Sequence, residues 1–387
     1  MKKTLAAVAV LGAFAGSAVA ADVTLYGLVD YSVRYQNLDA DMAGVDKTNK
    51  VDMKSGANSG SRFGLKGTED LGNGVKVGFV LENGFDADTG ALGDNKGNRL
   101  FDREAQLFVD GSFGRVSFGR VGQLASANGS YGLLGVTGPF STGYGDATSG
   151  LKFVGANGFT RFDNTITYMT PSFAGLTVYA QYSMDTNGTD GSVENESSSD
   201  RYYGIGAKFV AGGLTLVGVV DSINYATWPS TPTNQAMDDA LTVTLGGNYD
   251  FQVAKVYFGG QYFTNAKKVG QKNVSATSTM DKGYDFEKPY NGADGFGLGL
   301  GVGVPVMGGT FGAYAGYMKA DAVDSTAADD MSVKRMIGAV GYTYSFSKRT
   351  SIYTSASYTK DKVEYADSTK DRDPSSVEVL LGMIHKF

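Results

Sequence analysis

Two positive charges, four residues apart, lie on one face of a short alternating segment. In the segment SRFGLKG, Arg62 and Lys66 share one face of an extended strand, and Phe63 and Leu65 lie on the other face. Two such cations perform no covalent chemistry, but they attract anions and repel cations that pass close to them. The spacing therefore predicts an electrostatic site on one face of a β-strand.

Two more charged residues are predicted near this site. In VTLYGLVDYSVR, Arg34 shares one strand face with Asp30 and Ser32. Glu82, on the strand that follows Arg62, is expected on the same side, where its carboxylate would offset part of the positive charge.

Side chains that could catalyse a reaction are scarce. His385 is the only histidine and the chain contains no cysteine, so a zinc motif with two histidines is excluded. The G-x-S-x-G pattern of serine hydrolases is absent as well. The glycine-rich stretch 295–305 alternates with period two and lacks the G-x-G-x-x-G spacing, which favours a strand with a glycine face over a nucleotide-binding loop. We predict no catalytic residue, no metal site and no cofactor.

Strand patterns cover the chain from residue 23 to the end. About sixteen runs alternate apolar with polar or small residues, as half-buried strands do. Leu241, Val243 and Leu245, for example, alternate with Thr242 and Thr244. Their apolar face would meet either a second sheet, as in a soluble sandwich, or lipid, as in an outer-membrane barrel.

The connections between these runs distinguish the two folds. Short turns of a few residues alternate without a break with long polar connections. The long connections are expected at about 36–60, 86–98, 121–163, 183–200, 226–239, 266–293, 322–331 and 361–375. This alternation is typical of a transmembrane antiparallel β-barrel with an even number of strands, here about 16, and we expect its outer face to contact membrane lipid.

The first 20 residues look like a secretory signal peptide. A basic start is followed by a short apolar run from Leu5 to Phe14 and by the A-x-A pattern of residues 18–20. The apolar run is too short for a spanning helix. We therefore expect export and cleavage, with residues 21–387 forming a single barrel domain. The formal net charge is −6, which argues against a nucleic-acid partner.

Several motifs carry a resemblance to a known family. VTLYGLVDYSV, SRFGLKGTEDLGNGVKVGF and FDREAQLFVDGSFGRVSFGR, in this order and followed by the terminal HKF, resemble a general porin of the Gram-negative outer membrane, of the β-proteobacterial type. The resemblance implies a sixteen-stranded barrel, a homotrimer and a third external loop that folds into the lumen. It also implies that Phe387 is the signal for the barrel insertion machinery and that Arg103 belongs to the pore constriction.

The third connection, about 121–163, is the candidate constriction loop. It is too apolar and aromatic for a solvated tail, and its glycines permit tight folding. Many relatives carry an acidic pair soon after a proline here, whereas Pro139 is followed by Phe140 and Ser141, so Asp146 is the nearest acid. The alternative is that this connection caps the mouth from outside.

These observations predict a passive, water-filled pore for ions and small hydrophilic solutes, weakly selective by charge. The predicted constriction residues are Arg34, Arg62, Lys66, Arg103, Glu82 and Asp146. A barrel enzyme that hydrolyses lipid or protein and a surface adhesin are the alternatives. The single histidine argues against the enzyme, and only the resemblance argues against the adhesin.

Overall fold

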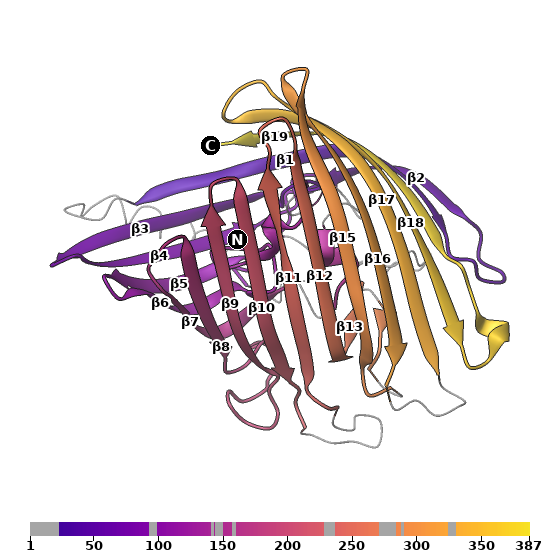
Figure 1. Cartoon of the computed structure of the whole chain (residues 1–387), viewed down its shortest axis with the longest axis horizontal. Helices are drawn as coiled ribbons and strands as arrows, with labels where there is room; N and C mark the ends of the chain where they lie inside the picture. Colours follow the sequence, from indigo (N-terminus) through magenta and orange to yellow (C-terminus); the bar gives the residue numbers. More distant parts are fainter. Residues whose placement is uncertain are drawn as a thin grey trace.

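The chain forms a closed antiparallel β-barrel (Figure 1). The computed structural model describes residues 23–92, 99–140, 143, 150–156, 160–227, 237–270, 284–287, 290–323 and 330–387. The predicted signal peptide, residues 1–20, lies outside the described residues and stays a prediction. In the described part of the chain, no helix is long and apolar enough to cross a membrane.

The barrel has sixteen strands around its wall, as predicted, although the sheet contains seventeen strand segments. The extra segment arises because β2 and β3 follow each other along the same neighbour, β1. The strands of the barrel are β1 (Thr24–Asp39), β2 (Thr48–Ser55), β3 (Arg62–Gly72), β4 (Val75–Gly84), β5 (Glu104–Gly111), β6 (Gly114–Gly122), β7 (Arg161–Met169), β8 (Leu176–Ser183), β9 (Arg201–Ala211), β10 (Leu214–Asn224), β11 (Ala240–Asp250), β12 (Lys255–Ala266), β15 (Ala293–Val306), β16 (Gly309–Ala322), β17 (Met331–Ser345), β18 (Thr350–Tyr365) and β19 (Ser375–Lys386).

The first and last strands close the barrel. β1 pairs with β19 from Leu28 opposite Lys386 to Asp39 opposite Ser375. The terminal Phe387 adds two backbone bonds to Gly27, of 3.0 and 3.1 Å, and its ring covers that glycine. The C-terminal residue therefore belongs to the seam that joins the two ends of the sheet.

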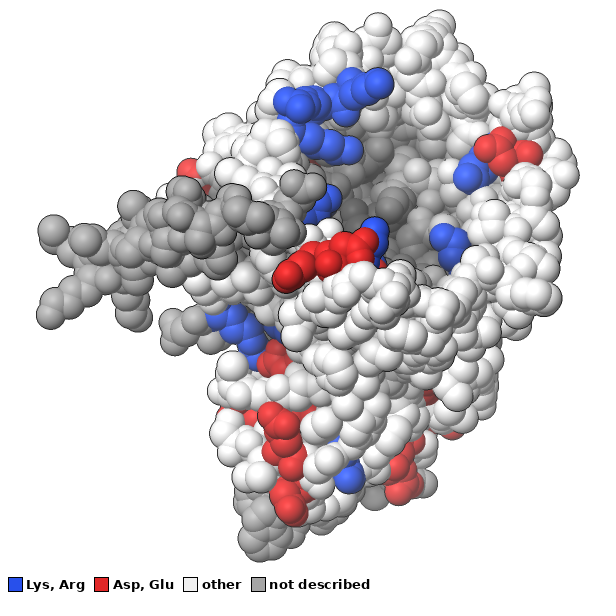
Figure 2. All heavy atoms as spheres, turned by 90° about the vertical axis from the view of Figure 1, so that its left-hand side faces the viewer, with Lys and Arg blue, Asp and Glu red and all other residues white. Residues whose placement is uncertain are grey.

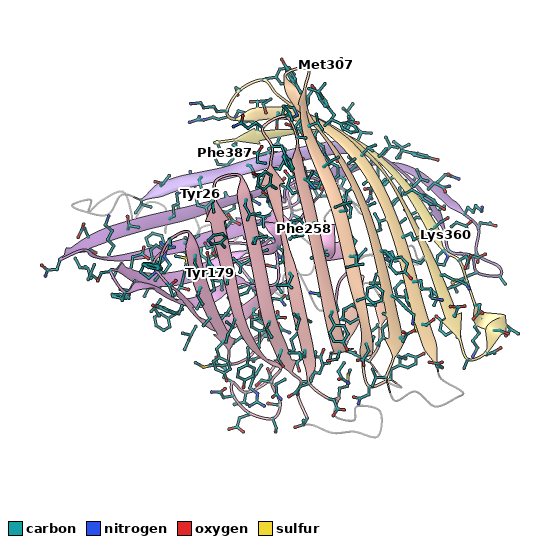
Figure 3. All side chains as sticks on the ribbon, in the orientation of Figure 1. Tyr26, Tyr179, Phe258, Met307, Lys360 and Phe387 are labelled. Atoms are coloured by element: carbon teal, nitrogen blue, oxygen red, sulfur yellow. The ribbon has the colours of Figure 1, made fainter. Side chains whose placement is uncertain are left out.

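Tight turns join the strands at one end of the barrel and longer connections join them at the other, as the sequence predicts. Met307, in the β15–β16 turn, and Phe387 lie toward the first end, and Lys360 lies toward the second (Figure 3). Two connections are shorter than predicted, because β1 and β2 continue to a hairpin at 40–47 and β18 continues to Tyr365. In β2, exposed Val51 and Met53 alternate with Lys50, Asp52 and Lys54, but this alternation is short and lies in a stretch rich in polar residues.

The apolar side of the strands faces outward. Gly246 and Gly259 face Thr137 of the third loop inside the barrel, so their neighbours Leu245 and Phe258 face away from the interior. Leu245 is 66% exposed. The face that carries Leu241, Val243 and Leu245 therefore meets the surroundings of the barrel and not a second sheet.

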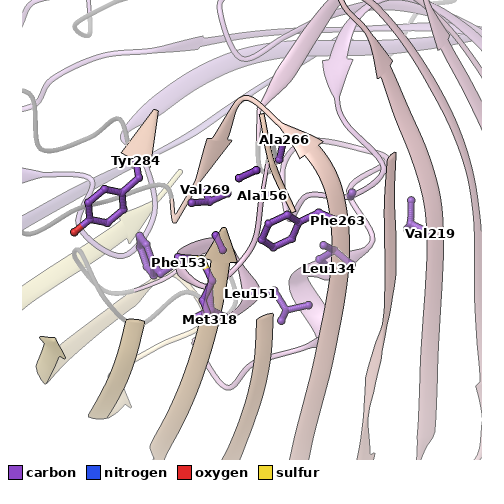
Figure 4. Packing of buried hydrophobic residues seen from close by; sticks show 14 of the residues in the cluster. Leu134, Leu151, Phe153, Ala156, Val219, Phe263, Ala266, Val269, Tyr284 and Met318 are labelled. Atoms are coloured by element: carbon purple, nitrogen blue, oxygen red, sulfur yellow. The ribbon is translucent and has the colours of Figure 1, made fainter. Parts of the chain in front are cut away.

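Part of the interior is filled by the described residues of the third loop (123–140, 143, 150–156 and 160) and by a short hairpin from the connection after β12. The third loop contains two 3₁₀ turns, η1 (Leu134–Val136) and η2 (Gly150–Phe153), and the hairpin consists of β13 (Lys268–Val269) and β14 (Tyr284–Asp285). A further 3₁₀ turn, η3 (Ser368–Lys370), lies outside in the last connection. Buried apolar side chains of both segments pack against the inner wall (Figure 4).

A buried carboxylate fixes the break between β2 and β3. Asp30 Oδ2 accepts hydrogen bonds from the backbone N–H groups of Asn58 (2.8 Å) and Ser59 (2.6 Å), and Oδ1 accepts one from the Tyr353 hydroxyl (2.7 Å). Asp30 is fully buried. Because a buried charge needs partners, this network ties β1, β18 and the segment 56–61 together.

We expect Tyr353→Phe to lower the free energy of unfolding by about 2 kcal/mol, since a bond to a buried carboxylate is lost. The measurement is the urea midpoint of the barrel in detergent micelles. Tyr358→Phe is the matched control, because Tyr358 lies on the same strand with its ring 48% exposed. Equal midpoints for the two variants would contradict a stabilising role for the Asp30 network.

Candidate functional site

The interior of the barrel is hollow on the side that the third loop leaves open. Figure 2 shows a deep hollow in one face of the molecule, with Lys and Arg side chains at its rim and within it. Fewer Asp and Glu side chains lie in the same hollow. The strands β1, β3, β4 and β5 contribute inward-facing charged residues on this side.

Arg62 on β3, Glu82 on β4 and Arg103 just before β5 form one cluster. Arg103 Nε donates to Glu82 Oε1 at 2.7 Å, and Arg62 Nε lies 3.5 Å from Glu82 Oε2. The Tyr26 hydroxyl donates to Glu82 Oε2 at 3.1 Å. The side chains of Arg62 and Arg103 are 25% and 16% exposed. One carboxylate therefore lies between two guanidinium groups, and the three side chains together carry one net positive charge.

Lys66 lies beside this cluster, further along β3 toward the tight turn. Its Nζ is 5.2 Å from the centre of the Tyr26 ring, the same ring whose hydroxyl binds Glu82. Lys66 itself is exposed. Arg62 and Lys66 therefore lie close together on β3, on the face that the sequence pattern predicts. Lys66 contacts the Tyr26 ring, and Arg62 contacts Glu82, the residue that Tyr26 binds.

Arg34 belongs to a different part of the wall. Leu28 pairs with Arg62, and Arg34 is six residues further along β1, a distance of about 20 Å. Its guanidinium makes two bonds with Asp52, at 2.6 and 2.8 Å, and lies 3.5 Å from Glu378. Two carboxylates compensate this single cation, so the structure does not bring Arg34 together with Arg62 and Arg103.

Two charged residues near the cluster are absent from the predicted set. Glu104 is buried at the start of β5, where its Oε1 accepts from the backbone N–H of Ser130 (3.1 Å) and from Gln106 Nε2 (2.7 Å). Arg161 starts β7, within the stretch that the sequence assigns to the third connection, and its buried Nε has no partner among the described residues. Period two along FDREAQLF would have placed Glu104 and Gln106 on one face.

Glu104 and Gln106 also anchor the beginning of the third loop. The hydroxyl of Tyr131 donates to Gln106 Oε1 at 3.0 Å. Burial raises the pKa of the Tyr131 phenol, so the group stays neutral and keeps its proton for this bond. From here the loop crosses the interior to the opposite wall. Asp146, the acid predicted on this loop, lies outside the described residues.

Glycines of the wall make room for the loop. A Cβ atom on Gly297 would overlap the carbonyl oxygen of Val154, and one on Gly301 would lie 2.6 Å from Pro139 Cδ. Among the described residues, wall glycines that meet third-loop atoms in this way include Gly206, Gly246, Gly259, Gly297, Gly301, Gly312 and Gly316. The stretch 295–305, predicted as a strand with a glycine face, is β15, and that face receives the loop.

The arrangement places charged side chains along one side of the interior. In the part of the chain that the structure describes, no three His, Cys, Asp or Glu side chains come together as they would around a metal ion. The loop begins against Glu104 and Gln106 on β5 and then lies against β9 to β17. Arg62 and Glu82 lie on β3 and β4, and Arg103 lies just before β5.

The known proteins that this chain resembles in sequence and structure are porins. The family model for Gram-negative porins matches residues 6–364. An outer membrane porin protein of Bordetella pertussis is 32% identical over 100% of both chains, and outer membrane porin protein 32 of Delftia acidovorans is 32% identical over 94% of this chain and 90% of its own. The solved structure of the anion-selective porin from Comamonas acidovorans has a TM-score of 0.64 and 26% identity, covering 95% of this chain and 100% of that one. The chain therefore belongs to the Gram-negative porin family, as a channel for passive diffusion in the outer membrane and not an enzyme.

Proposed function

We propose that the third loop and the cluster of Arg62, Glu82 and Arg103 form the waist of this channel. The waist excludes solutes by size and favours small anions weakly. The observation that carries the proposal is the position of two guanidinium groups around one carboxylate on the wall that the loop leaves open. Lys66 adds a second net positive charge close by.

The size of the electrostatic effect follows from Coulomb's law. A unit charge at ~7 Å from a permeating ion contributes roughly 332/(80 × 7), or ~0.6 kcal/mol, in bulk water. This energy changes the local ion concentration about threefold. Glu82 cancels one of the two arginine charges, so the net preference is modest. The similarity to a porin described as anion-selective supports the same direction here.

The partners of the channel follow from its surface and from its relatives. The outward apolar side chains fit outer-membrane lipid, which surrounds the barrel. We further propose that three copies assemble as a homotrimer and that the insertion machinery reads Phe387. The ring of Phe387 is 49% exposed at the end of the seam, which supports its recognition by another protein.

Shortening the third loop tests its role in size exclusion. Gly138 and Gly150 lie side by side, because a Cβ on Gly138 would be 3.3 Å from Gly150 Cα. Their Cα atoms are therefore at most about 5 Å apart, against the ~3.8 Å between bonded neighbours. Deletion of residues 139–149 therefore joins two glycines without stretching the chain. We expect larger single-channel conductance and passage of bulkier sugars, because the tip is lost while its anchors at Glu104 and Gln106 remain.

Liposome swelling with sugars of increasing mass measures the exclusion limit, and heat resistance of the folded barrel on gels shows that it is intact. A folded deletion variant with the parent exclusion limit would place the narrowing elsewhere.

Charge-neutralising variants test the preference for anions. At 0.1 M salt, screening roughly halves the ~0.6 kcal/mol, so one unit charge changes the anion-to-cation permeability ratio about threefold. We therefore expect Glu82→Gln to raise this ratio about threefold and Arg62→Gln with Arg103→Gln, which removes two charges, to lower it roughly sevenfold. Reversal potentials across a salt gradient measure both. The differences should fade at 1 M salt, where the Debye length is about 3 Å.

Lys47→Gln is the matched control for these variants, because Lys47 lies on the hairpin outside the pore and pairs with Asp39. A double arginine variant as selective as the parent at low salt would remove both arginines from the filter.

A further inference from the structure

The third loop and the β13–β14 hairpin meet inside the barrel. Ala156 and Val269 face each other as an isolated antiparallel bridge, and the N–H of Gly270 donates to the carbonyl of Gly155 at 2.8 Å. Figure 4 shows Ala156 beside Val269 and Phe153 near Tyr284. The hairpin thus contacts the returning limb of the third loop through its backbone.

A buried ion pair lies under this contact. Arg335 on β17 and Asp361 on β18 form two bonds of 2.7 Å, and both side chains are 0% exposed. Each partner also holds one of the interior segments. Arg335 Nη1 donates to the carbonyl of Phe153 at 3.1 Å, and the Tyr284 hydroxyl donates to Asp361 Oδ2 at 2.6 Å. The pair therefore connects the barrel wall to the loop and to the hairpin at once.

The surroundings leave this pair one arrangement. Met318 and Val363 are fully buried in the apolar cluster that includes Phe153, so neither charge has water as an alternative partner. Gly270 has a φ of +58°, and a Cβ there would be 2.6 Å from Arg335 Nη1. Glycine is thus required where the hairpin passes over the guanidinium.

A second ion pair between the same strands shows what the buried pair adds. Lys334 and Glu364 lie 2.9 Å apart on β17 and β18, with side chains 38% and 34% exposed. Within the described part of the chain, the hydrogen bonds of this pair join residues of β17 and β18. Strand pairing alone therefore does not need an ion pair that reaches the third loop.

We propose that Arg335, Asp361 and Tyr284 form a clamp that positions the third loop and so sets the conductance of the open channel. The connection between β12 and β15, which contains β13 and β14, thereby helps to determine the width of the pore. The inference rests on the proposed role of the third loop in the waist. The three residues are positioning residues, because they act through the loop and not on the solute.

Two variants loosen the clamp to different extents. Tyr284→Phe removes only the bond from the hairpin and leaves both charges paired, and Asp361→Asn weakens the hold on Arg335 as well. We expect roughly tenfold more time in altered conductance levels, the factor that one lost bond to a charged group corresponds to. Single-channel recordings in planar bilayers measure these levels. The control, Lys334→Gln with Glu364→Gln, should record as the parent does.

A cross-link supplies the rescue. The chain has no cysteine, so Ala156→Cys with Val269→Cys creates the only possible disulfide. Opposite residues of an antiparallel bridge have Cα atoms about 4.5–5.5 Å apart, which suits a disulfide. In the Asp361→Asn background, oxidation should restore steady parent conductance and reduction should abolish the rescue. A purely structural defect of the barrel would not respond to this cross-link.

Two experimental results would contradict the clamp without contradicting the proposed waist. Tyr284→Phe and Asp361→Asn channels that assemble and conduct as the parent does would overturn the clamp, even where deletion of residues 139–149 widens the pore. Altered conductance in Asp361→Asn that oxidation of the cross-link fails to restore would overturn it too. Failure of the waist itself would appear as an unchanged exclusion limit in the deletion variant.

Discussion

Closure of the sheet is the constraint on which the rest of this molecule depends. In lipid, an unpaired backbone N–H or C=O has no water to bond, so every strand must pair on both sides. The pairing of β1 with β19 and the bonds between Gly27 and Phe387 meet this condition at the seam. Once the wall is closed, its two faces separate. The outside must be apolar, whereas the inside is free to hold charges and a folded loop.

The interior is divided between two kinds of side chain. On β11 to β16, inward glycines leave space that the third loop fills, since any Cβ at Gly297 would overlap the loop backbone. On β3 to β5, inward positions carry long charged side chains such as Arg62 and Glu82. The loop therefore lies against one half of the wall and the charges project from the other half. This asymmetry sets a side of the interior that the loop fills against a side that carries charged residues.

Much of the fold follows from period two in the sequence, and the departures have physical causes. Alternation predicted the strands, the outward Leu245 and the glycine face of β15, because one side chain in two contacts each environment. It did not predict the length of β1, β2 and β18, since strands that extend beyond the membrane no longer need an apolar face.

For the candidate site, sequence spacing finds neighbours along one strand but not across the barrel. Arg62 and Lys66 were grouped correctly on β3, because residues two and four apart share a face. Arg34 was grouped with them, yet register places it about 20 Å away, and the register of a closed sheet is not visible in a local pattern. Arg335 and Asp361 were missed for the same reason, since their partners Phe153 and Tyr284 are distant in the chain.

The carboxylate in the waist has a role beyond reducing its charge. Arg62 and Arg103 both form ion pairs with Glu82. Without the Glu82 carboxylate, the two neighbouring guanidinium groups would repel each other and their side chains would turn apart. Glu82 holds the guanidinium groups in fixed positions, and Tyr26 holds Glu82. An ordered pair of cations thus requires a compensating anion beside it. Arg62, Glu82 and Arg103 therefore form one ordered charged unit of the inner wall.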